Sequence, residues 1–448
     1  MPETEELTGQ VRVITVPYGD GVVSARIPAH RLAGVAVPPS GEEGIHDQGD
    51  VLRRALSHPV GSPTLRELAR GRQSAVVVTG DYTRATPTAR MLPLILGELQ
   101  AGGMDPARVV VLVGGGIHPP STLQQARRLV GEGNLDTFDF RLAVHHPDRE
   151  EELVRVGRTS YGVEVWLNRE YVSADLRVAL GTIEPHHLAG WSGGAKAVLP
   201  GVAGRSTVTG HHALAMRPGV EAGVLEGNPF REGLEEVLDL CPLHFVLNVA
   251  LDQAGRIVQA WAGHPVTAHR AGVSELQRRV VVWVPERYPV VVVSLGGAPR
   301  DGDLWQAEGK GLGRARPALA PGGVLILCAR MERGVGDQVL ARYLGAGSPA
   351  AVRERFRAEE FSVAGFKAWR LARLVEDYRV FLVTEGLRPG DLPGFPVRFF
   401  GGLQAALDEA FRGLPADARV YVIPRSLEVI IRYRKEPPGE EGDRPVQC

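Results

Sequence analysis

The stretch EPHHLAGWSGGAKAVLPGVAGRSTVTGHH, from Glu184 to His212, gathers four histidines and one lysine in one short segment. These side chains are His186, His187, Lys196, His211 and His212. A strand-like run, LRVALGTI, comes immediately before the stretch, and two glycines precede the lysine. Glycine and serine after a strand favour a tight turn whose backbone N–H groups can face an anion or a close-packed cofactor. A Pro-Gly pair then ends any helix, so the lysine is expected on a short, constrained element.

Continuous apolar runs alternate with helical patterns on both sides of this stretch. The runs AVVV and VVVLV begin at Ala75 and Val109, and the runs VVVV and VLIL begin at Val290 and Val324. Such runs next to glycines are typical of buried parallel strands, and their alternation with helices indicates an α/β fold. The sequence therefore predicts two Rossmann-like α/β domains, with the active site in the cleft between them.

The predicted domain boundary lies near residue 282. Residues 1–282 are expected to form an N-terminal α/β domain for catalysis and cofactor binding, and residues 283–435 a C-terminal α/β domain. Residues 436–448 are polar and rich in proline, so a disordered tail is expected there. The finer expectations are a hairpin within 11–36, a helical stretch over 49–72, a strand pair over 163–181, a helix over 303–318 and long helical stretches over 336–375.

The composition excludes several classes of protein. Hydrophobic residues make up 44% and charged residues 23% of the 448 residues, as in ordinary soluble globular proteins. A net charge of -1 gives no sign of a nucleic-acid partner or an anionic membrane, and no 18-residue apolar run predicts a transmembrane helix. The polar N-terminus does not read as a signal peptide. Three widely spaced cysteines indicate neither a disulfide framework nor a zinc site, so a reducing cytoplasm is the expected location.

Two further motifs follow the apolar runs of the first half. GDYTRATP places Asp81, Thr83 and Arg84 within four residues, and Arg suits a planar carboxylate or a phosphate. The alternative is an N-capping Asp and a surface Arg at a helix start. VVVLVGGGIH places His118 shortly after three glycines, which indicate a phosphate loop only weakly because the lysine of a P-loop is absent. A lone histidine after a strand is more often structural than catalytic.

The central stretch allows more than one chemistry when taken alone. Four histidines raise the option of a zinc site, although their spacing fits no common zinc pattern. Lys196 could also form a Schiff base. On extended backbone, neighbouring side chains point to opposite faces, so only one residue of each His-His pair is expected to reach the site.

Together these motifs resemble the nickel-dependent lactate racemase family and its 2-hydroxyacid racemase and epimerase relatives. The family combines Pro-His, Gly-x-Ser-Gly-Gly-x-Lys, Pro-Gly and a later histidine in this order. This chain carries the same elements as Pro185-His186, Gly190-Trp191-Ser192-Gly193-Gly194-Ala195-Lys196, Pro200-Gly201 and His212. The resemblance extends from about residue 10 to residue 430. It also includes an Asp-x-Thr-Arg motif, at Asp81 to Arg84, and a histidine at the place of His118.

The resemblance implies a role for each of these residues. It implies a nickel-pincer nucleotide, pyridinium-3,5-bisthiocarboxylic acid mononucleotide with nickel, tethered to Lys196 through a thioamide bond, with His212 as the metal ligand. His118 and His186 would then be the two acid–base residues, and Arg84 would bind substrate. The residues expected to contact the cofactor are Asp81, Thr83, Ser192, Gly193, Gly194 and Lys196.

The second half carries a weaker part of the resemblance. A Ser-x-Gly-Gly-x-Pro-x-Asp run starts at Ser294, and Gln306 follows it. The family places a substrate-binding lysine three residues after this glutamine, where this chain has Gly309, followed by Lys310. One residue of shift turns a helical side chain by about 100°. Lys310 is therefore expected to join Gln306 in binding substrate only if the local helix is shifted by one residue.

The resemblance implies inversion of a 2-hydroxyacid, lactate or a larger acid, through a 2-keto acid. The hydrogen at C2 is poorly acidic, so its removal as a hydride requires a cofactor, while histidines exchange the hydroxyl proton. The alternatives are a metal-dependent hydrolase using the same histidines and a non-catalytic nickel or cofactor carrier. The expected partner is a small 2-hydroxyacid, with no nucleic acid and no membrane.

Overall fold

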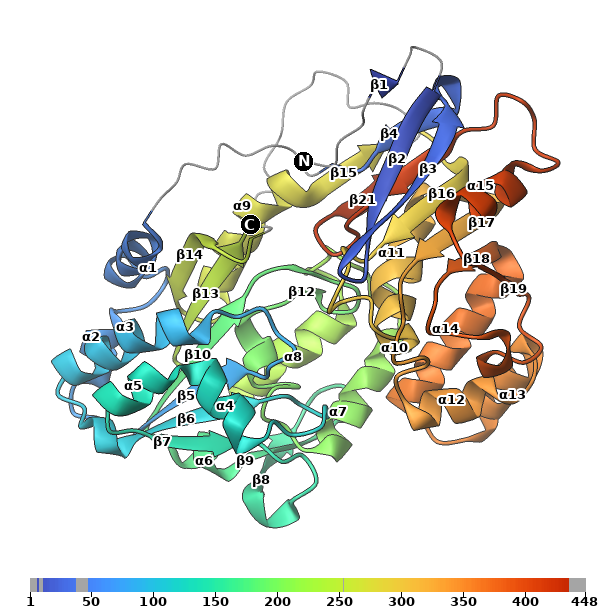
Figure 1. Cartoon of the computed structure of the whole chain (residues 1–448). Coiled ribbons are helices and arrows are strands. Elements are labelled where there is room, and N and C mark those ends of the chain that lie inside the picture. The colour runs from blue at the N-terminus through green and yellow to red at the C-terminus, as the bar shows by residue number, and fades with distance from the viewer. Residues whose placement is uncertain (1–5, 8–10, 38–46, 253, 435–448) are drawn as a thin grey trace. The chain divides into compact units, whose positions relative to one another are not determined.

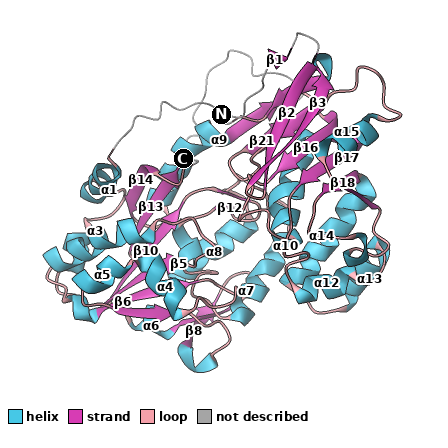
Figure 2. Cartoon of the chain, in the orientation of Figure 1, coloured by secondary structure: helices cyan, strands magenta, loops and turns pink. Residues whose placement is uncertain are grey.

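The computed structural model describes residues 6–7, 11–37, 47–252 and 254–434, and its chain divides into two compact units. The units are named by their place in the sequence: the central unit is the middle of the chain, Ser40–Arg279, and the outer unit combines its two ends, Met1–Pro39 and Val280–Cys448. The predicted tail at 436–448 lies outside the described residues. Each unit contains a six-stranded, mostly parallel sheet with helices packed against it, which confirms the predicted α/β class (Figure 2). None of the described helices combines the length and the apolar character needed to cross a bilayer.

The main sheet of the central unit has the order β14-β13-β10-β5-β6-β7. Its strands are β5 (Ala75–Gly80), β6 (Val109–Gly114), β7 (Arg141–Val144), β10 (Leu176–Thr182), β13 (Phe245–Leu251) and β14 (Ile257–Gly263). Read from β7, this is the 3-2-1-4-5-6 order of a dinucleotide-binding domain. All neighbours are parallel except the β13–β14 pair at the edge.

Helices and two small sheets complete the central unit. The helices are α1 (Gln48–Ser57), α2 (Leu65–Ala69), α3 (Thr88–Ala101), α4 (Leu123–Val130), α5 (Glu132–Thr137), α6 (Arg169–Ser173), α7 (Arg205–His212), α8 (Pro229–Leu240) and α9 (Thr267–Val280). The small sheets pair β8 (Leu153–Arg158) with β9 (Glu164–Asn168) and β11 (Pro185–His186) with β12 (Gly190–Trp191). The core forms where the apolar face of α3, with Met91, Ile95 and Leu99, packs on the valines of β5 and β6.

The main sheet of the outer unit has the order β19-β18-β17-β16-β20-β4, and all its neighbours are parallel. Its strands are β4 (Leu32–Val35), β16 (Tyr288–Ser294), β17 (Leu319–Cys328), β18 (Arg379–Val383), β19 (Val397–Phe400) and β20 (Val420–Ile423). The other strands are β1 (Glu6–Leu7), β2 (Val11–Tyr18), β3 (Gly21–Pro28), β15 (Val281–Val284) and β21 (Ile430–Tyr433). The helices are α10 (Leu304–Ala307), the π turn η6 (Glu308–Leu312), α11 (Gly313–Ala315), α12 (Gln338–Leu344), α13 (Pro349–Ala358), α14 (Val363–Asp377) and α15 (Leu403–Phe411).

The N-terminal segment corrects the predicted domain plan, which assigned it to the first domain. The expected hairpin forms as β2 and β3, but it packs on the sheet of the outer unit, beside β16 and β17 (Figure 1). Ile14 and Val16 of the hairpin share one core with Val292 and Ile326. β4 then joins the same sheet next to β20. The segment belongs to the outer unit because its apolar side chains are buried there.

Other expectations fail where prolines or short helices intervene. The helical stretch over 49–72 is two helices, because α1 ends at Ser57, ahead of Pro59, and the backbone before a proline avoids the helical region. The strand pair over 163–181 is wrong as a pair. β9 binds β8, and α6, which is capped by the side chain of Asn168, separates it from β10. By contrast, the long helical stretches expected over 336–375 are confirmed as α12, α13 and α14.

Candidate active site

Two loops meet at the point of the central sheet where the strand order reverses. β5 connects onward to β6 on one side, while its other neighbour, β10, continues to β13. Ligands of open α/β sheets bind beyond the carboxyl ends of the strands at such a switch point. The loop after β5 carries the Asp81 to Arg84 motif, and the loop after β10 carries His186. The hydroxyl groups of Thr86 and Thr182 lie 3.1 Å apart and link the two loops.

A side-chain hydrogen bond joins Asp81 and His118 at this point. The side chain of Asp81 is buried, and its Oδ2 lies 2.8 Å from Nδ1 of His118. The other oxygen, Oδ1, accepts the hydroxyl proton of Thr83 at 2.6 Å. Burial raises the pKa of Asp81, but the hydrogen bonds and nearby charges of His118, Thr83 and Arg84 together outweigh it, so the pKa is lowered. With Nδ1–H donated to a carboxylate, the lone pair of His118 Nε2 is the one available to a substrate.

Arg84 is set by the turn that Asp81 begins. Its backbone N–H donates to the carbonyl of Asp81 at 3.0 Å. Its side chain passes over Gly80, where an added Cβ would lie 2.9 Å from Cγ of Arg84. The motif is therefore a defined turn at the end of β5. Asp81 binds His118 from a distant loop, which goes beyond the local helix-capping role that the sequence also allowed.

The three glycines before His118 allow a close approach of two backbones. A Cβ on Gly114 would lie 2.6 Å from the carbonyl oxygen of Gly201, and a Cβ on Gly115 would lie 2.9 Å from Oδ2 of Asp81. Gly116, with φ of +58°, donates its N–H to the carbonyl of Gly201 at 3.0 Å. This packing against the Pro200-Gly201 step accounts for the glycine run without a phosphate.

His186 is held in a different tautomer from His118. Its Nδ1 accepts the backbone N–H groups of Leu188 at 3.2 Å and Ala189 at 3.1 Å, so the proton of the neutral ring lies on Nε2. The ring of His187 stacks on it, with centroids 4.8 Å apart. The expectation that these neighbours point to opposite faces is wrong, because the chain leaves β11 and enters a turn at His187.

The glycines before Lys196 meet buried side chains rather than open space. Gly193 and Gly194 have φ of +80° and +58°, and added Cβ atoms would lie 2.8 Å from Oδ1 of Asn248 and 3.0 Å from Cγ of His269. Lys196 follows on a 3-10 turn, Gly194–Ala197. The hydroxyl of Ser192 donates to the carbonyl of Thr182 at 2.6 Å and accepts from the N–H of Glu184 at 2.9 Å. Ser192 thus ties the loop to the end of β10, a structural role that the sequence did not indicate.

Four buried side chains form hydrogen bonds to the backbone of this loop. Asn228 donates to the carbonyl of Leu188 at 2.8 Å, and His269 Nε2 donates to that of Ser192 at 2.8 Å. Arg231 is fully buried and donates to the carbonyls of Ala189, at 3.1 Å, and Trp191. Asn248 Oδ1 accepts from the N–H of Gly194 at 3.3 Å. Sequence reasoning missed these four residues, because an Arg or His inside an amphipathic helix gives no sign that it faces inward.

His211 and His212 differ in burial and in the nitrogen they use. His211 is 1% exposed, packs edge-on against Phe230 and donates from Nε2 to the carbonyl of Phe230 at 2.9 Å. Burial holds the pKa of His211 well below its ordinary value. His212 is half-buried and donates from Nδ1 to the carbonyl of Val208 at 2.8 Å. A histidine held in this way through Nδ1 presents Nε2, the arrangement common among metal ligands.

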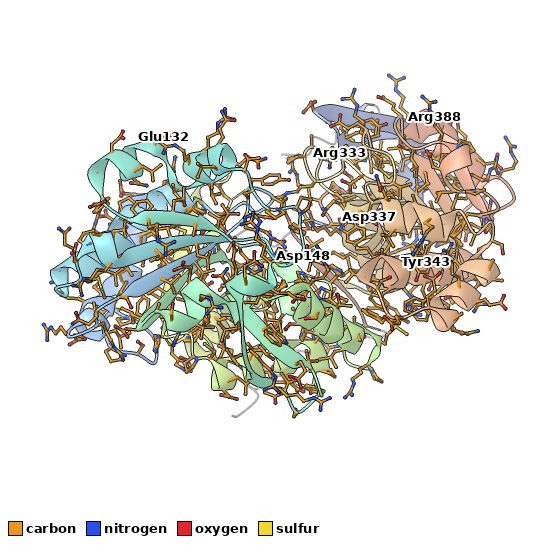
Figure 3. All side chains as sticks on the ribbon, turned by 90° about the horizontal axis from the view of Figure 1, so that it is seen from below. Glu132, Asp148, Arg333, Asp337, Tyr343 and Arg388 are labelled. Carbon is orange, nitrogen blue, oxygen red and sulfur yellow. The ribbon has the colours of Figure 1, made fainter. Side chains whose placement is uncertain are left out.

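The helix that carries His212 is anchored at its first residue. Arg205 donates from Nε and Nη2 to the two oxygens of Asp148, at 2.5 and 2.8 Å, and Asp148 is labelled in Figure 3. Gly204 and Arg205 also bond through their backbones to Trp166 and Pro147. No group of three or more His, Cys, Asp or Glu side chains that could hold a metal occurs among the described residues.

In the outer unit, Gln306 and Lys310 lie on the same side of their helix. The turn between them is π-helical over Glu308–Leu312, and it accommodates the extra residue relative to the family spacing. Nζ of Lys310 donates to Oε1 of Gln306. Lys310 and Gln306 are therefore neighbours, and their part in binding substrate stays a prediction. The helix start is fixed by Asp303, which caps Gln306 N at 2.8 Å and binds Arg333, labelled in Figure 3.

Comparisons with known proteins agree with these motifs. The lactate racemase N-terminal domain matches residues 18–223, and the lactate racemase C-terminal domain matches residues 285–431. The chain is 30% identical to a lactate racemase of Thermoanaerobacterium thermosaccharolyticum over 94% of this chain and 99% of that one. It is 27% identical to a lactate racemase of Lactiplantibacillus plantarum, with the same two coverages.

Solved structures show the same likeness. The structure of the lactate racemase apoprotein from T. thermosaccharolyticum matches with a TM-score of 0.87 and 30% identity, covering 94% of this chain and all of that one. A crystal structure of a Thermotoga maritima protein shares the fold alone, with a TM-score of 0.63 and 16% identity over 84% of this chain and all of that one. The chain therefore belongs to the lactate racemase family and is an isomerase of the racemase type.

Proposed function

We propose that this protein inverts the configuration at C2 of a 2-hydroxyacid, with lactate or a larger acid as substrate. The observation that carries the proposal is the Asp81–His118 pair at the switch point of the central sheet. A carboxylate that fixes the proton on Nδ1 leaves Nε2 able to take the proton of a substrate hydroxyl. Arg84, on the same loop, is suited to the substrate carboxylate.

The residues of the central stretch fit a lysine-tethered nickel-pincer nucleotide. Lys196 lies on a short turn whose backbone is fixed by buried side chains, and His212, which uses Nδ1 for the carbonyl of Val208, would ligate nickel through Nε2. When bound, this group supplies a reversible acceptor for the hydride at C2, which no amino-acid side chain provides. A hydrolase using these histidines would instead need about three protein ligands on one metal.

The two histidines have complementary parts in this proposal. His118 takes the hydroxyl proton at Nε2, and the imidazolium that results is stabilised by the buried carboxylate of Asp81. His186, with Nδ1 facing two backbone N–H groups, offers Nε2–H to the substrate oxygen. His186 can take a proton at Nε2 only after its ring proton has moved to Nδ1. That change of tautomer breaks the hydrogen bonds that Nδ1 accepts from Leu188 and Ala189.

The test is intact-mass and metal analysis of the protein produced in a host that makes the cofactor. We expect wild type to carry added mass and nickel, and to racemise lactate or another 2-hydroxyacid in a panel followed by chiral chromatography. Lys196→Ala should lose the mass, while Lys310→Ala keeps it. His212→Ala should lose nickel, while His211→Ala keeps it and unfolds more easily. Racemisation by protein with no added mass, or nickel loss in His211→Ala alone, would contradict the assignment.

A further inference from the structure

The carboxyl end of β20 faces the helix that carries Gln306 and Lys310. In the outer sheet the strand order reverses between β16 and β20, so a second switch point lies there. Ser426 follows β20 and is fully buried. Its backbone N–H donates to the carbonyl of Ser294, at the end of β16, at 2.9 Å, so both strand ends hold it.

Ser426 also holds the π turn through its side chain. Its hydroxyl donates to the backbone carbonyl of Lys310 at 2.7 Å, and its own carbonyl accepts from Nη1 of Arg314 at 2.9 Å. A π turn replaces the bond from residue i to i+4 by a bond to i+5, which is uncommon and needs outside support. Ser426 thus binds the backbone of Lys310, the residue whose ammonium group donates to Gln306.

The start of the turn is held by side chains of α14. Glu308 is 4% exposed, and its oxygens lie 3.1 Å from Nε of Arg370 and 3.4 Å from Nζ of Lys367. Lys367 also donates to the carbonyl of Trp305 at 2.9 Å. Within the turn, a Cβ on Gly311 would lie 2.9 Å from Leu295 and 3.0 Å from Leu327. The backbone of the turn therefore packs closely on side chains of the outer sheet and of the loop after β16. The backbone of Lys310 therefore has little freedom to move.

From these contacts we infer that Ser426 is a positioning residue for Lys310. By fixing the Lys310 carbonyl, it sets where the ammonium group stands against Gln306, and so determines how tightly an organic carboxylate binds there. The inference rests on the proposed function, in that Lys310 binds the carboxylate of a 2-hydroxyacid. Ammonium and amide N–H donors side by side suit a carboxylate, which has two oxygens to fill.

The first test separates binding from turnover in cofactor-loaded enzyme. Ser426→Ala should raise KM for the racemised acid by about tenfold, equivalent to one hydrogen bond, and leave kcat within about twofold. Lys310→Ala should raise KM at least as much, and the double variant should equal Lys310→Ala alone, because Ser426 acts only through Lys310. Additive effects of the two substitutions on KM would overturn the inference.

The matched control is Ser348→Ala, which removes a part-buried serine hydroxyl at a helix cap of the same unit. Ser348 accepts the N–H of Ala351 at 3.2 Å at the start of α13, away from the π turn. Its loss should lower the denaturation midpoint, because a helix cap is removed, and should leave KM within about twofold of the wild-type value. An equal KM increase in Ser348→Ala and Ser426→Ala would show that Ser426 affects KM only through the general stability of the unit and does not position Lys310.

A second readout does not depend on turnover. Competitive labelling of amines, followed by mass spectrometry, should show a several-fold change in the labelling rate of Lys310 in Ser426→Ala, with Lys196 unchanged. An unchanged rate at Lys310 would overturn the inference even if the enzyme is active. Absence of racemisation by wild type would count against the proposed function, while a changed rate at Lys310 would still support the part played by Ser426.

Discussion

At the scale of single residues, Asp81 binds Nδ1 of His118 and so leaves Nε2 as the nitrogen for the proposed role as a base. Its carboxylate accepts from Nδ1, and its pKa is lowered despite burial, so it is ionised throughout the neutral range. Asp81→Asn replaces an acceptor by an amide that can donate to Nδ1 and so favours the wrong tautomer. By analogy with the Asp of a Ser-His-Asp triad, kcat should fall by about 10³ to 10⁴.

The same substitution has a pH signature in stability. Because the folded pKa of Asp81 is below its ordinary value, its contribution is fully present above that value and is lost as the pH falls through the folded pKa. Denaturant unfolding of wild type and Asp81→Asn between pH 6 and pH 3 should therefore give curves that converge toward acid pH. A constant difference between the two proteins down to pH 3 would show that the carboxylate is not stabilised in the fold.

The candidate site residues could be named from the sequence because they stand in short motifs at strand ends, and their chemical roles stay predictions. Asp81, His118 and His186 all follow predicted apolar strands, and the structure places two of them in contact. The residues behind the loop were not predictable. Arg231 and His269 come from α8 and α9, and only the packing of these helices directs them toward the loop backbone.

At the scale of elements, the loop from Leu188 to Gly194 depends on side chains of α8, β13 and α9. Arg231 is fully buried, and burial lowers its pKa to about 10. Arg231→Met leaves the carbonyls of Ala189 and Trp191 without their partner, which should lower the free energy of unfolding by about 2–4 kcal/mol. The loosened loop should also reduce the mass added at Lys196 in loaded protein.

The control for this prediction is Arg127→Met on α4. Arg127 has a side-chain exposure of 45% and binds the exposed Glu132 at 2.6 Å, so its loss should cost at most about 1 kcal/mol. Tether occupancy should stay at the wild-type value. Equal losses of occupancy in both variants would argue against a specific hold on the loop.

The π turn at Glu308–Leu312 could not be predicted from the sequence. The sequence predicts a regular helix over 303–318, in which Lys310 is turned by about 100° from the family position. The structure instead forms a π turn, which is held by Ser426 at the carbonyl of Lys310 and by Arg370 and Lys367 at the side chain of Glu308. These partners lie far away in the sequence, so no local pattern could reveal the turn.

At the scale of the whole molecule, the predicted α/β class is confirmed, while the assignment of the first 39 residues depends on a long-range core. The hairpin β2–β3 is complete in itself and easy to recognise, but local sequence does not say which sheet it covers. Its apolar face fits the outer sheet, next to β16 and β17. Gly19 N also bonds to Asp301 at 2.8 Å, which attaches the hairpin tip there.

Buried neutral histidines should make the protein sensitive to acid. Burial lowers the pKa of His145 and His244 to about 4 and that of His269 to about 3. Below the ordinary value of about 6.5, the unfolded chain binds protons that the folded chain does not, so stability falls as the pH drops toward these values. Each fully buried histidine contributes a slope of up to about 1.4 kcal/mol per pH unit. Urea unfolding at pH 7.5, 6 and 5 measures it, and equal stability at all three would contradict the burial of neutral rings.

The most direct test of the central claim is to incubate an enantiopure 2-hydroxyacid with loaded enzyme in D₂O and to analyse C2 of the product. If the C2 hydrogen leaves with its electron pair while His118 takes only the hydroxyl proton, it returns to the other face without meeting solvent. The account predicts a racemic product with protium retained at C2 and deuterium only at exchangeable positions. Deuterium at C2, as proton abstraction by two bases would give, or no loss of optical purity with any 2-hydroxyacid, would contradict it.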